Sequence, residues 1–315
     1  MCCLFGLMDC QHRLTVKQKN RILSALSVAA EARGTDATGI AYNSGGKLHI
    51  YKRPLPAHRM RFHVPEDACV IMGHTRMTTQ GAARKNRNNH PFSGKAGTTD
   101  FALAHNGVLW NDGYLRRSRD LPDTKIETDS FVAVQLLERK KALNLASLKW
   151  MAEQVEGSFS FTVLDGSDCL HIIRGNNPFC LYSYPKLGIY LYASTEEILK
   201  QALSRLWLSG KQFTRVELDC GDILQISSDG TMTRGRFDGS ALLGWEEIPW
   251  LFSARWHRGS GKQETDQYLE ELRAVAPSFG YVPDAVDRLS ARGFTPEDIE
   301  EFFYCGCFAE IGGEL

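Results

Sequence analysis

Cys2 directly follows Met1 and has the chemistry of a nucleophile. If Met1 is removed, this residue carries both a thiol and a free α-amino group. An ordinary thiol has a pKa near ~8.5 and an α-amino group one near ~7.7–8.0, so the amine can accept the thiol proton through a water. No catalytic histidine is then required. Two plainer explanations stay open: Cys2 is a small residue at the start of a strand, or Cys2 and Cys3 are S-acylated.

Three further segments bring polar residues to the ends of apolar strands or to the start of a helix. Residues 73–81 read GHTRMTTQG and are followed at 88–91 by NNHP, residues 105–107 read HNG, and residues 127–130 read ETDS. Each has an ordinary explanation when taken alone. Arg76 is then a surface charge, Asn106-Gly107 is a turn, and Asp129 is an acid at a helix N-terminus.

Taken in order, these segments resemble the class II glutamine amidotransferases, including the glutaminase domain of glucosamine-6-phosphate synthase. The matching motifs are an N-terminal Cys, G-H-T-R-x-x-T-x-G, N-x-H-P, H-N-G and E-T-D, with R-G-x-D-x-x-G-I at residues 33–40. Weaker matches follow, so the resemblance covers about residues 2–240. The chain departs from the family at Cys3, where glycine is common, and at Met77, where an aromatic residue is common.

The resemblance assigns a role to each matching residue. Cys2 is the nucleophile, and the side-chain amide of Asn106 and the backbone N–H of Gly107 form the oxyanion hole. Arg76 holds the α-carboxylate of glutamine, which suits a planar guanidinium. Asp129 pairs with the α-ammonium group. Substrate binding also involves two further residues, Thr79 and His90.

The alternation of strand-like and helix-like stretches in the first 240 residues favours an α+β fold over a parallel βαβ sheet. By resemblance, the expected architecture is the four-layer αββα sandwich of the N-terminal nucleophile hydrolases, with Cys2 opening a central strand. Composition changes after Gly244. We therefore expect a glutaminase domain at residues 1–244, and a linker with a small helical tail at residues 245–315.

Hydrophobic periodicity and turn residues predict the individual elements. Helices are expected at 16–32, 130–140, 145–155 and 195–206; Ser194 should cap the last of these, with Glu197 completing a capping box. Strands are expected at 47–52, 68–73, 101–105, 158–164, 170–174, 189–193, 223–227 and 231–236. Asp229-Gly230 predicts a tight primed turn. Residues 44–47, SGGK, fit a hairpin turn better than a nucleotide-binding loop.

Composition excludes several other classes of function. Lys plus Arg and Asp plus Glu each total 37, so no net charge attracts nucleic acid or an anionic membrane. The sequence has no apolar run long enough for a membrane span and no basic region typical of a signal peptide, so a cytoplasmic location is expected. Nine scattered cysteines indicate reduced thiols. Cys305 and Cys307 lack a companion pair, and we expect neither a metal nor a cofactor.

The resulting hypothesis is a thiol-dependent hydrolysis of the glutamine side-chain amide to glutamate and ammonia. About seventy residues follow Gly244, which is too few for a sugar-isomerase or phosphoribosyltransferase acceptor domain. The ammonia acceptor is therefore left open: either a separate synthase or acceptor subunit receives the ammonia, or the chain is a free-standing hydrolase of glutamine. Two alternatives stay open. The chain is a free-standing hydrolase of another γ-glutamyl amide, or it is a glutamine-sensing module without turnover.

Overall fold

The computed structural model describes residues 2–243 and, beyond these, 269–270, 272–274, 276–279, 282–294, 296 and 299. The chain divides into two compact units, Met1–Leu243 and Gly244–Leu315. Within the described residues, no helix is long and apolar enough to cross a membrane. Cys305 and Cys307 lie outside the described residues, as does the predicted linker.

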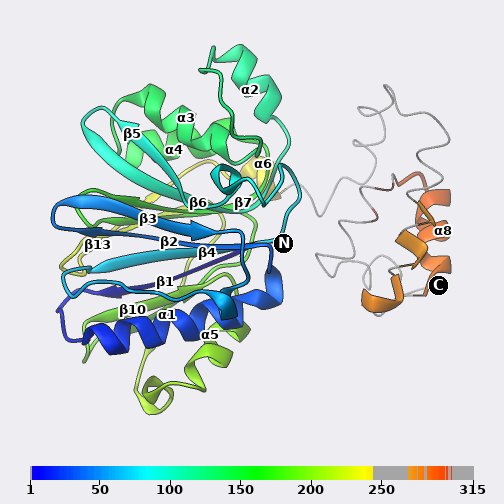
Figure 1. Ribbon diagram of the computed structural model, residues 1–315. Helices are drawn as coiled ribbons and strands as arrows, with labels where there is room; N and C mark the ends of the chain where they lie inside the picture. The colour runs from blue at the N-terminus through cyan, green and yellow to red at the C-terminus, as the bar shows by residue number, and fades with distance from the viewer. Residues whose placement is uncertain are drawn as a thin grey trace. The chain divides into compact units, whose positions relative to one another are not determined.

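Two stacked antiparallel sheets form the centre of the first unit (Figure 1). The seven-stranded sheet has the order β11-β9-β10-β1-β4-β2-β3. Its strands are Cys3–Asp9 (β1), Ala37–Ser44 (β2), Lys47–Arg53 (β3), Val70–Arg76 (β4), Cys180–Tyr184 (β9), Ile189–Ala193 (β10) and Thr214–Val216 (β11). The six-stranded sheet has the order β13-β12-β8-β7-β6-β5. Its strands are Phe92–Ala96 (β5), Thr99–Leu109 (β6), Gly157–Asp165 (β7), Leu170–Arg174 (β8), Asp222–Ile226 (β12) and Met232–Arg236 (β13).

Helices cover the two outer faces of this sandwich. Figure 1 shows α1 and α5 under the seven-stranded sheet, and α3 and α4 over the six-stranded sheet. The helices of the first unit are Val16–Ala30 (α1), Asp112–Ser118 (α2), Phe131–Lys140 (α3), Leu145–Gln154 (α4), Glu196–Leu203 (α5) and Ser240–Leu243 (α6). Short 3-10 helices occupy Glu31–Arg33, Ala57–Arg59, Asn86–Asn88 and Trp207–Gly210. The predicted α+β, four-layer αββα class is confirmed.

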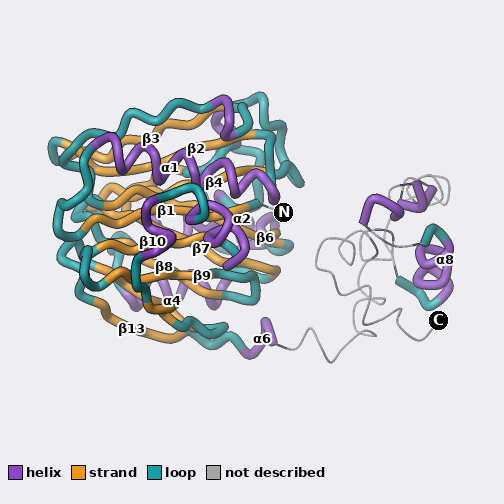
Figure 2. Tube along the Cα trace, turned by 90° about the horizontal axis from the view of Figure 1, so that it is seen from below, coloured by secondary structure: helices purple, strands orange, loops and turns teal. Residues whose placement is uncertain are grey.

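Strand alternation explains the layers, because successive side chains point to opposite faces of a sheet. In β1, Phe5 and Leu7 pack with residues of α1 and α5, whereas Leu4 and Met8 pack between the two sheets. In β6, Leu103 packs under α3 and α4, whereas Ala102 faces the inter-sheet layer. Figure 2, turned by 90°, shows the strands of the first unit running side by side as stacked ribbons.

The second unit has a small apolar cluster of its own. It contains the helix Asp284–Ala291 (α8) and the 3-10 turn Ala276–Phe279. Leu272, Val286 and Ile299 are among its buried members. Helix α8 ends at Ala291, and Gly293 follows with a φ of +94°. The described part of this unit is therefore helical.

Most predicted elements form within a few residues of the expected bounds, and two local predictions are wrong. Thr195, not Ser194, caps α5 by accepting from the Ile198 N–H. Ser194 instead extends the sheet, since its hydroxyl accepts from the Leu4 N–H at 2.9 Å and its own N–H donates to the Leu4 carbonyl. The predicted capping box with Glu197 is therefore absent from α5, whose first residue is Glu196.

The second correction concerns the β12–β13 hairpin. The two strands pair as predicted, but only Gly230 of the Asp229-Gly230 pair has a positive φ, whereas a type I′ turn needs two. The Gly230 N–H donates to the Ser227 carbonyl, so the connection is a longer loop. Gly45 and Gly46 do have φ values of +55° and +71°, which fits the hairpin turn predicted between β2 and β3.

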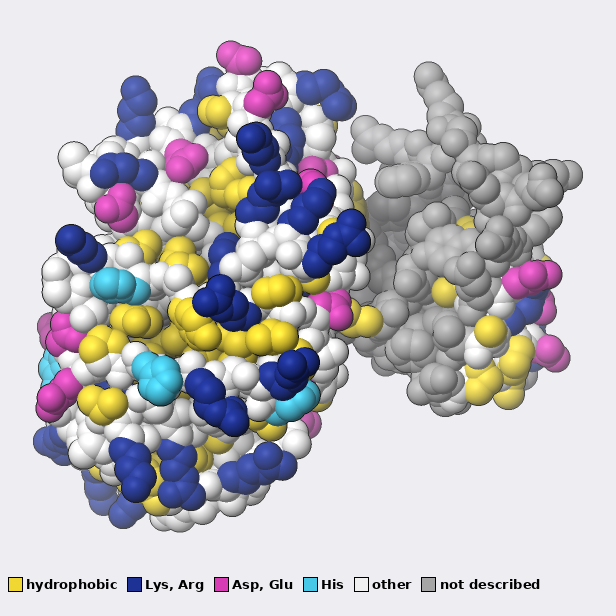
Figure 3. Space-filling view, viewed as in Figure 1, with side chains coloured by type: hydrophobic (Ala, Val, Ile, Leu, Met, Phe, Trp, Pro, Cys, Tyr) yellow, Lys and Arg dark blue, Asp and Glu magenta, His cyan; other side chains and the backbone are white. Residues whose placement is uncertain are grey.

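Figure 3 shows the distribution of side-chain types on one face of the first unit. Apolar side chains form a band across its middle, and Lys and Arg side chains lie above and below this band. The described exposed apolar residues include Val108, Trp110 and Tyr114, which follow the Asn106-Gly107 pair in the chain.

Candidate active site

Cys2 lies at the start of β1, between β10 and β4 in the seven-stranded sheet. Two contacts hold the backbone that follows the thiol. Arg33 Nε donates to the Cys2 carbonyl at 3.1 Å, and Ser194 holds Leu4 as described above. The strand therefore presents the thiol at a defined place.

The Cys2 thiol donates to the Met77 carbonyl, with the sulfur 3.5 Å from the oxygen. Burial of the sulfur is the largest effect and raises the pKa of the thiol, and the nearby charge of Arg76 lowers it by less. A thiol with a raised pKa is mostly protonated at neutral pH, so a nucleophilic Cys2 requires a nearby base.

Arg76 is the last residue of β4, and its side chain is 2% exposed. Its guanidinium makes three hydrogen bonds to the chain. Nη1 donates to Asn89 Oδ1 at 2.6 Å, and Nη2 donates to the carbonyls of Gln80 at 2.5 Å and Gly81 at 2.7 Å. The buried cation is held by neutral oxygens, which leaves its charge available to an anionic ligand.

Asp129 is buried just before α3, which begins at Phe131. Its Oδ2 accepts from the Leu109 N–H at 2.7 Å, and its Oδ1 from the Ser130 hydroxyl at 3.2 Å. Its own N–H donates to Gln80 Oε1 at 2.9 Å. The carboxylate thus links the end of β6 to the start of α3, and it precedes the first helical turn instead of lying in it.

Asn106 and Gly107 lie in β6, where the strand pairs with Ser160 and Phe159 of β7. By alternation, the Asn106 side chain shares the inter-sheet face with Ala104. Neither polar atom of this buried amide forms a hydrogen bond within the described part of the chain. A buried amide without partners is rare and suggests a functional ligand.

His90 is buried between aromatic neighbours. Its ring lies 4.2 Å from that of His74 and 4.3 Å from that of Phe92, measured between centroids. Neither ring nitrogen has a partner among the described residues. Burial lowers the pKa of His90 well below its usual range, so the ring is neutral.

A recess with about 10 Å³ of free volume, room for about one water, brings these groups together. It includes six of the seven predicted site residues, whereas Asn106 does not line it. The lining residues are Cys2, Arg76, Met77, Thr79, Gln80, His90, His105, Gly107, Thr128, Asp129 and Ser130. A larger hollow of about 360 Å³ lies over β3, Asn86 and Ser93, and no described cysteine lines it.

The structure adds residues that sequence reasoning did not single out. Arg33 holds the Cys2 carbonyl, and the Arg33-Gly34 motif could have indicated it. Gly34 is required because an added Cβ would lie 2.4 Å from the Arg76 carbonyl carbon. Asn177 Nδ2 donates to the Asn106 carbonyl at 2.9 Å, and no motif in the sequence pointed to this contact.

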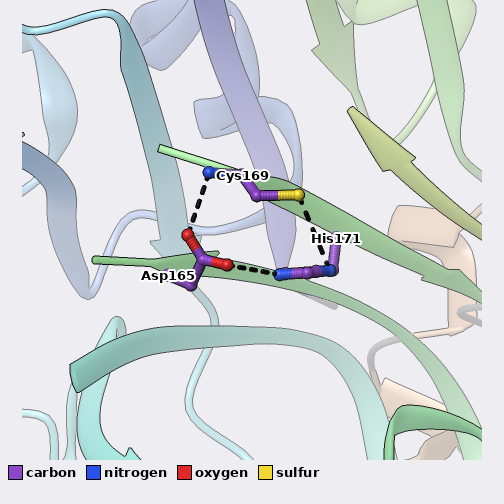
Figure 4. Close-up of side chains that lie close together, drawn as sticks. All are labelled: Asp165, Cys169 and His171. Atoms are coloured by element: carbon purple, nitrogen blue, oxygen red, sulfur yellow. Dashed lines mark hydrogen bonds and ion pairs between the residues drawn. The ribbon is translucent and has the colours of Figure 1, made fainter. Parts of the chain in front are cut away.

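Among the described residues, Asp165, Cys169 and His171 form a group whose ligand atoms all lie within 4.8 Å of one another (Figure 4). His171 Nε2 lies 3.1 Å from Asp165 Oδ2, and its Nδ1 lies 2.9 Å from Gln225 Nε2. A metal ion needs a ring nitrogen lone pair, and both nitrogens already have hydrogen-bond partners. We interpret the group as a brace of the β7–β8 hairpin, at the opposite end of β7 from the strand's pairing with Asn106-Gly107.

Comparison with curated proteins identifies the relatives of this chain. It is 30% identical over 311 residues to the glutamine--fructose-6-phosphate aminotransferase of Caldanaerobacter subterraneus subsp. tengcongensis, covering 92% of this chain and 48% of that protein. It is 28% identical over 249 residues to the amidophosphoribosyltransferase of Methanocaldococcus jannaschii, and this match covers 76% of this chain and 49% of that protein. The chain is homologous to the class II glutamine amidotransferases.

Comparison with solved structures identifies a chain with the same fold. The glutamine phosphoribosylpyrophosphate amidotransferase of B. subtilis matches with a TM-score of 0.58 and 22% identity, over 75% of this chain and 49% of that one. No family model matches the sequence. This amidotransferase homologue spans about half the length of the curated relatives named here.

Proposed function

We propose that this chain hydrolyses the side-chain amide of glutamine through a covalent thioester on Cys2. The observation that carries the proposal is the recess itself, in which a thiol, a buried guanidinium and a buried carboxylate line one small space. An α-amino acid has one carboxylate and one ammonium group, and Arg76 and Asp129 are complementary to these two charges.

The proposed chemistry has two steps. The Cys2 thiolate attacks the side-chain carbonyl carbon of glutamine, and the C–N bond then breaks to release ammonia, which carries away the thiol proton. Water next attacks the γ-glutamyl thioester, giving glutamate and the free thiol. Asn106 Nδ2 and the Gly107 N–H are the proposed donors to the oxyanion formed in each step.

The proposed base is the α-amino group of Cys2, which becomes available only after Met1 is removed. The raised pKa of the thiol supports this assignment, since a protonated thiol needs a base close to the sulfur. The described buried histidines make poorer bases. Burial lowers the pKa of His74 to about 3, and His90 and His105 shift in the same direction.

We further propose that the released ammonia passes to an acceptor domain or subunit. The relatives named above are transferases by name, which supports an acceptor. Hydrolysis of another γ-glutamyl amide and glutamine sensing without turnover are the two alternative functions.

Ammonia release from glutamine by the purified protein tests the proposal, with mass spectrometry of the N-terminus to establish whether Met1 is present. Cys2→Ser should lose turnover and keep its melting temperature, whereas the matched control Cys3→Ser should retain turnover. An electrophilic glutamine analogue should label Cys2. Unchanged turnover in Cys2→Ser would sink the assignment of the nucleophile, and glutamine binding without ammonia release would favour the sensing module.

A further inference from the structure

Asn89 contacts Arg76, the residue proposed to bind the α-carboxylate of the substrate, and no sequence motif gives Asn89 a function. It lies between Asn88 and His90, at the variable position of the N-x-H-P segment. Its side chain is fully buried, and its Oδ1 accepts from Arg76 Nη1 at 2.6 Å. The other two acceptors of the Arg76 guanidinium are backbone carbonyls, whereas Asn89 contributes a side-chain oxygen.

The other polar groups of Asn89 are also engaged. Its Nδ2 donates to the Ala83 carbonyl at 2.8 Å, and its carbonyl accepts from Lys52 Nζ at 2.5 Å. Its N–H donates to the Asn86 carbonyl. A side chain held at both ends has little rotational freedom, so the direction of Oδ1 is fixed by the surrounding chain.

Strands β2 and β3 hold the whole Asn89 segment in place. Lys52 Nζ also donates to the Pro91 carbonyl at 2.9 Å, and it lies 5.0 Å from the centroid of the Phe92 ring. Gly39 of β2 permits this approach, because an added Cβ would lie 2.2 Å from the His90 carbonyl oxygen. The sheet therefore holds the backbone of the Asn89 segment, and the Ala83 carbonyl fixes the side-chain amide.

We infer that Asn89 is a positioning residue that orients the Arg76 guanidinium for the α-carboxylate of the substrate. The guanidinium is planar and grips a carboxylate at two points only when its plane is correctly turned. An amide oxygen fixes that plane without neutralising the charge. This inference rests on the proposed function, because it takes Arg76 as the carboxylate grip.

Two substitutions separate orientation from charge. Asn89→Leu keeps a similar volume and removes the acceptor, so a buried Nη1 donor loses its partner. Asn89→Asp keeps an acceptor that Arg76 can bind, and it adds a negative charge that competes with the substrate carboxylate. Glutamine affinity should fall about 10- to 100-fold in both variants, while kcat stays within about threefold.

The first measurement is glutamine binding by calorimetry in a Cys2→Ala background, where no turnover is needed. Arg87→Ala is the matched control, because it changes an exposed side chain of the same turn. This control should bind glutamine within about twofold of the parent. Wild-type affinity in a folded Asn89→Asp or Asn89→Leu protein would overturn the inference.

The second measurement is a double-mutant cycle on kcat/KM, taken from initial rates at low glutamine in protein with Cys2 intact. If Asn89 acts through Arg76, adding Asn89→Leu to Arg76→Ala should change kcat/KM by less than about twofold. Equal losses in the two backgrounds would show a merely structural role and overturn the inference. A wild-type protein that binds glutamine without releasing ammonia would instead refute the proposed hydrolysis and leave the binding test decisive.

Discussion

Gly107 has a φ of +140°, and an added Cβ would lie 1.9 Å from the Ser158 carbonyl oxygen. A side chain at this point of β6 would therefore displace β7 as well as strain the backbone. The same position supplies a backbone N–H next to the unpartnered amide of Asn106. Both proposed donors belong to β6, which pairs with β7 at these two residues, so their backbone is held in register before any reaction.

Asn106→Ala should reduce kcat for glutamine hydrolysis and leave KM nearly unchanged, because the amide is proposed to stabilise charge that exists only along the reaction path. Removal of one oxyanion donor typically costs roughly 2.7–4 kcal/mol, or about 10²–10³ in rate. Steady-state kinetics measure the change, with the melting temperature as a check on the fold. If Asn106→Ala keeps the wild-type kcat, the Asn106 amide does not stabilise the oxyanion and its role is structural.

Arg76→Ala and Asp129→Ala should each raise KM for glutamine more than they lower kcat, since each residue is proposed to hold a group that the substrate keeps throughout the reaction. Asp129 also accepts from the Leu109 N–H, so Asp129→Asn, which keeps an acceptor, is the matched control for the fold. Steady-state kinetics on folded protein give the result. The two assignments fail if both variants keep the wild-type KM.

At the scale of elements, β4 and β6 place neutral imidazoles beside the recess. Nε2 of His74, in β4, lies 2.9 Å from the carbonyl oxygen of His105, in β6. His105 Nδ1 in turn lies 2.8 Å from the Ser130 hydroxyl, next to α3. These contacts tie the seven-stranded sheet to the six-stranded sheet and to α3 at the site. Burial of the rings is what makes protonation unfavourable.

Burial lowers the pKa of His74 to about 3 in the folded protein, whereas the same histidine in the unfolded chain has a pKa near ~6.5. The unfolding free energy should therefore fall as pH drops from 6.5 towards 3, by about 1.4 kcal/mol per pH unit for this histidine, and should not depend on it above 6.5. Denaturant unfolding at several pH values measures this. His74→Gln should flatten the acid side of the profile, whereas exposed His63→Gln should not; equal slopes in all three proteins would contradict the prediction.

At the scale of the whole molecule, the chain contains two compact units, each with its own apolar cluster. The core of the first unit still includes Phe237 and Leu242, near its end at Leu243. Phe237 is 4% exposed, and its ring lies 5.8 Å from that of Phe159. The proposed glutaminase domain at residues 1–244 therefore needs its final turn for packing.

A chain cut within residues 245–268 should keep the melting temperature of the first unit and the proposed ammonia release, because the described site residues all precede Leu243. A chain cut after Arg236 is the matched control. It lacks Phe237, and loss of a buried Phe side chain costs about 3–5 kcal/mol. Thermal unfolding and the ammonia assay compare the two chains. Lost activity in the longer one would show that the second unit contributes to the site.

The sequence alone determined the features that depend on near neighbours. Apolar alternation located strands such as Leu170–Arg174 and Ile189–Ala193, whose predicted and observed bounds coincide. Capping chemistry located helix starts, although only within a residue at α5, where Ser194 and Thr195 are both good caps. The ordered motifs named site residues because each motif is a short, contiguous string.

Only the tertiary structure decided how those residues act on one another. Arg76 donates a hydrogen bond to Asn89, and Arg33 donates one to the Cys2 carbonyl. Ser194 does not cap α5, because its hydroxyl accepts from the N–H of Leu4, which lies 190 residues earlier in the sequence. Each of these contacts joins segments that come together only when the chain folds. A hydrogen bond depends on distance and direction in space, and local sequence constrains neither across such separations.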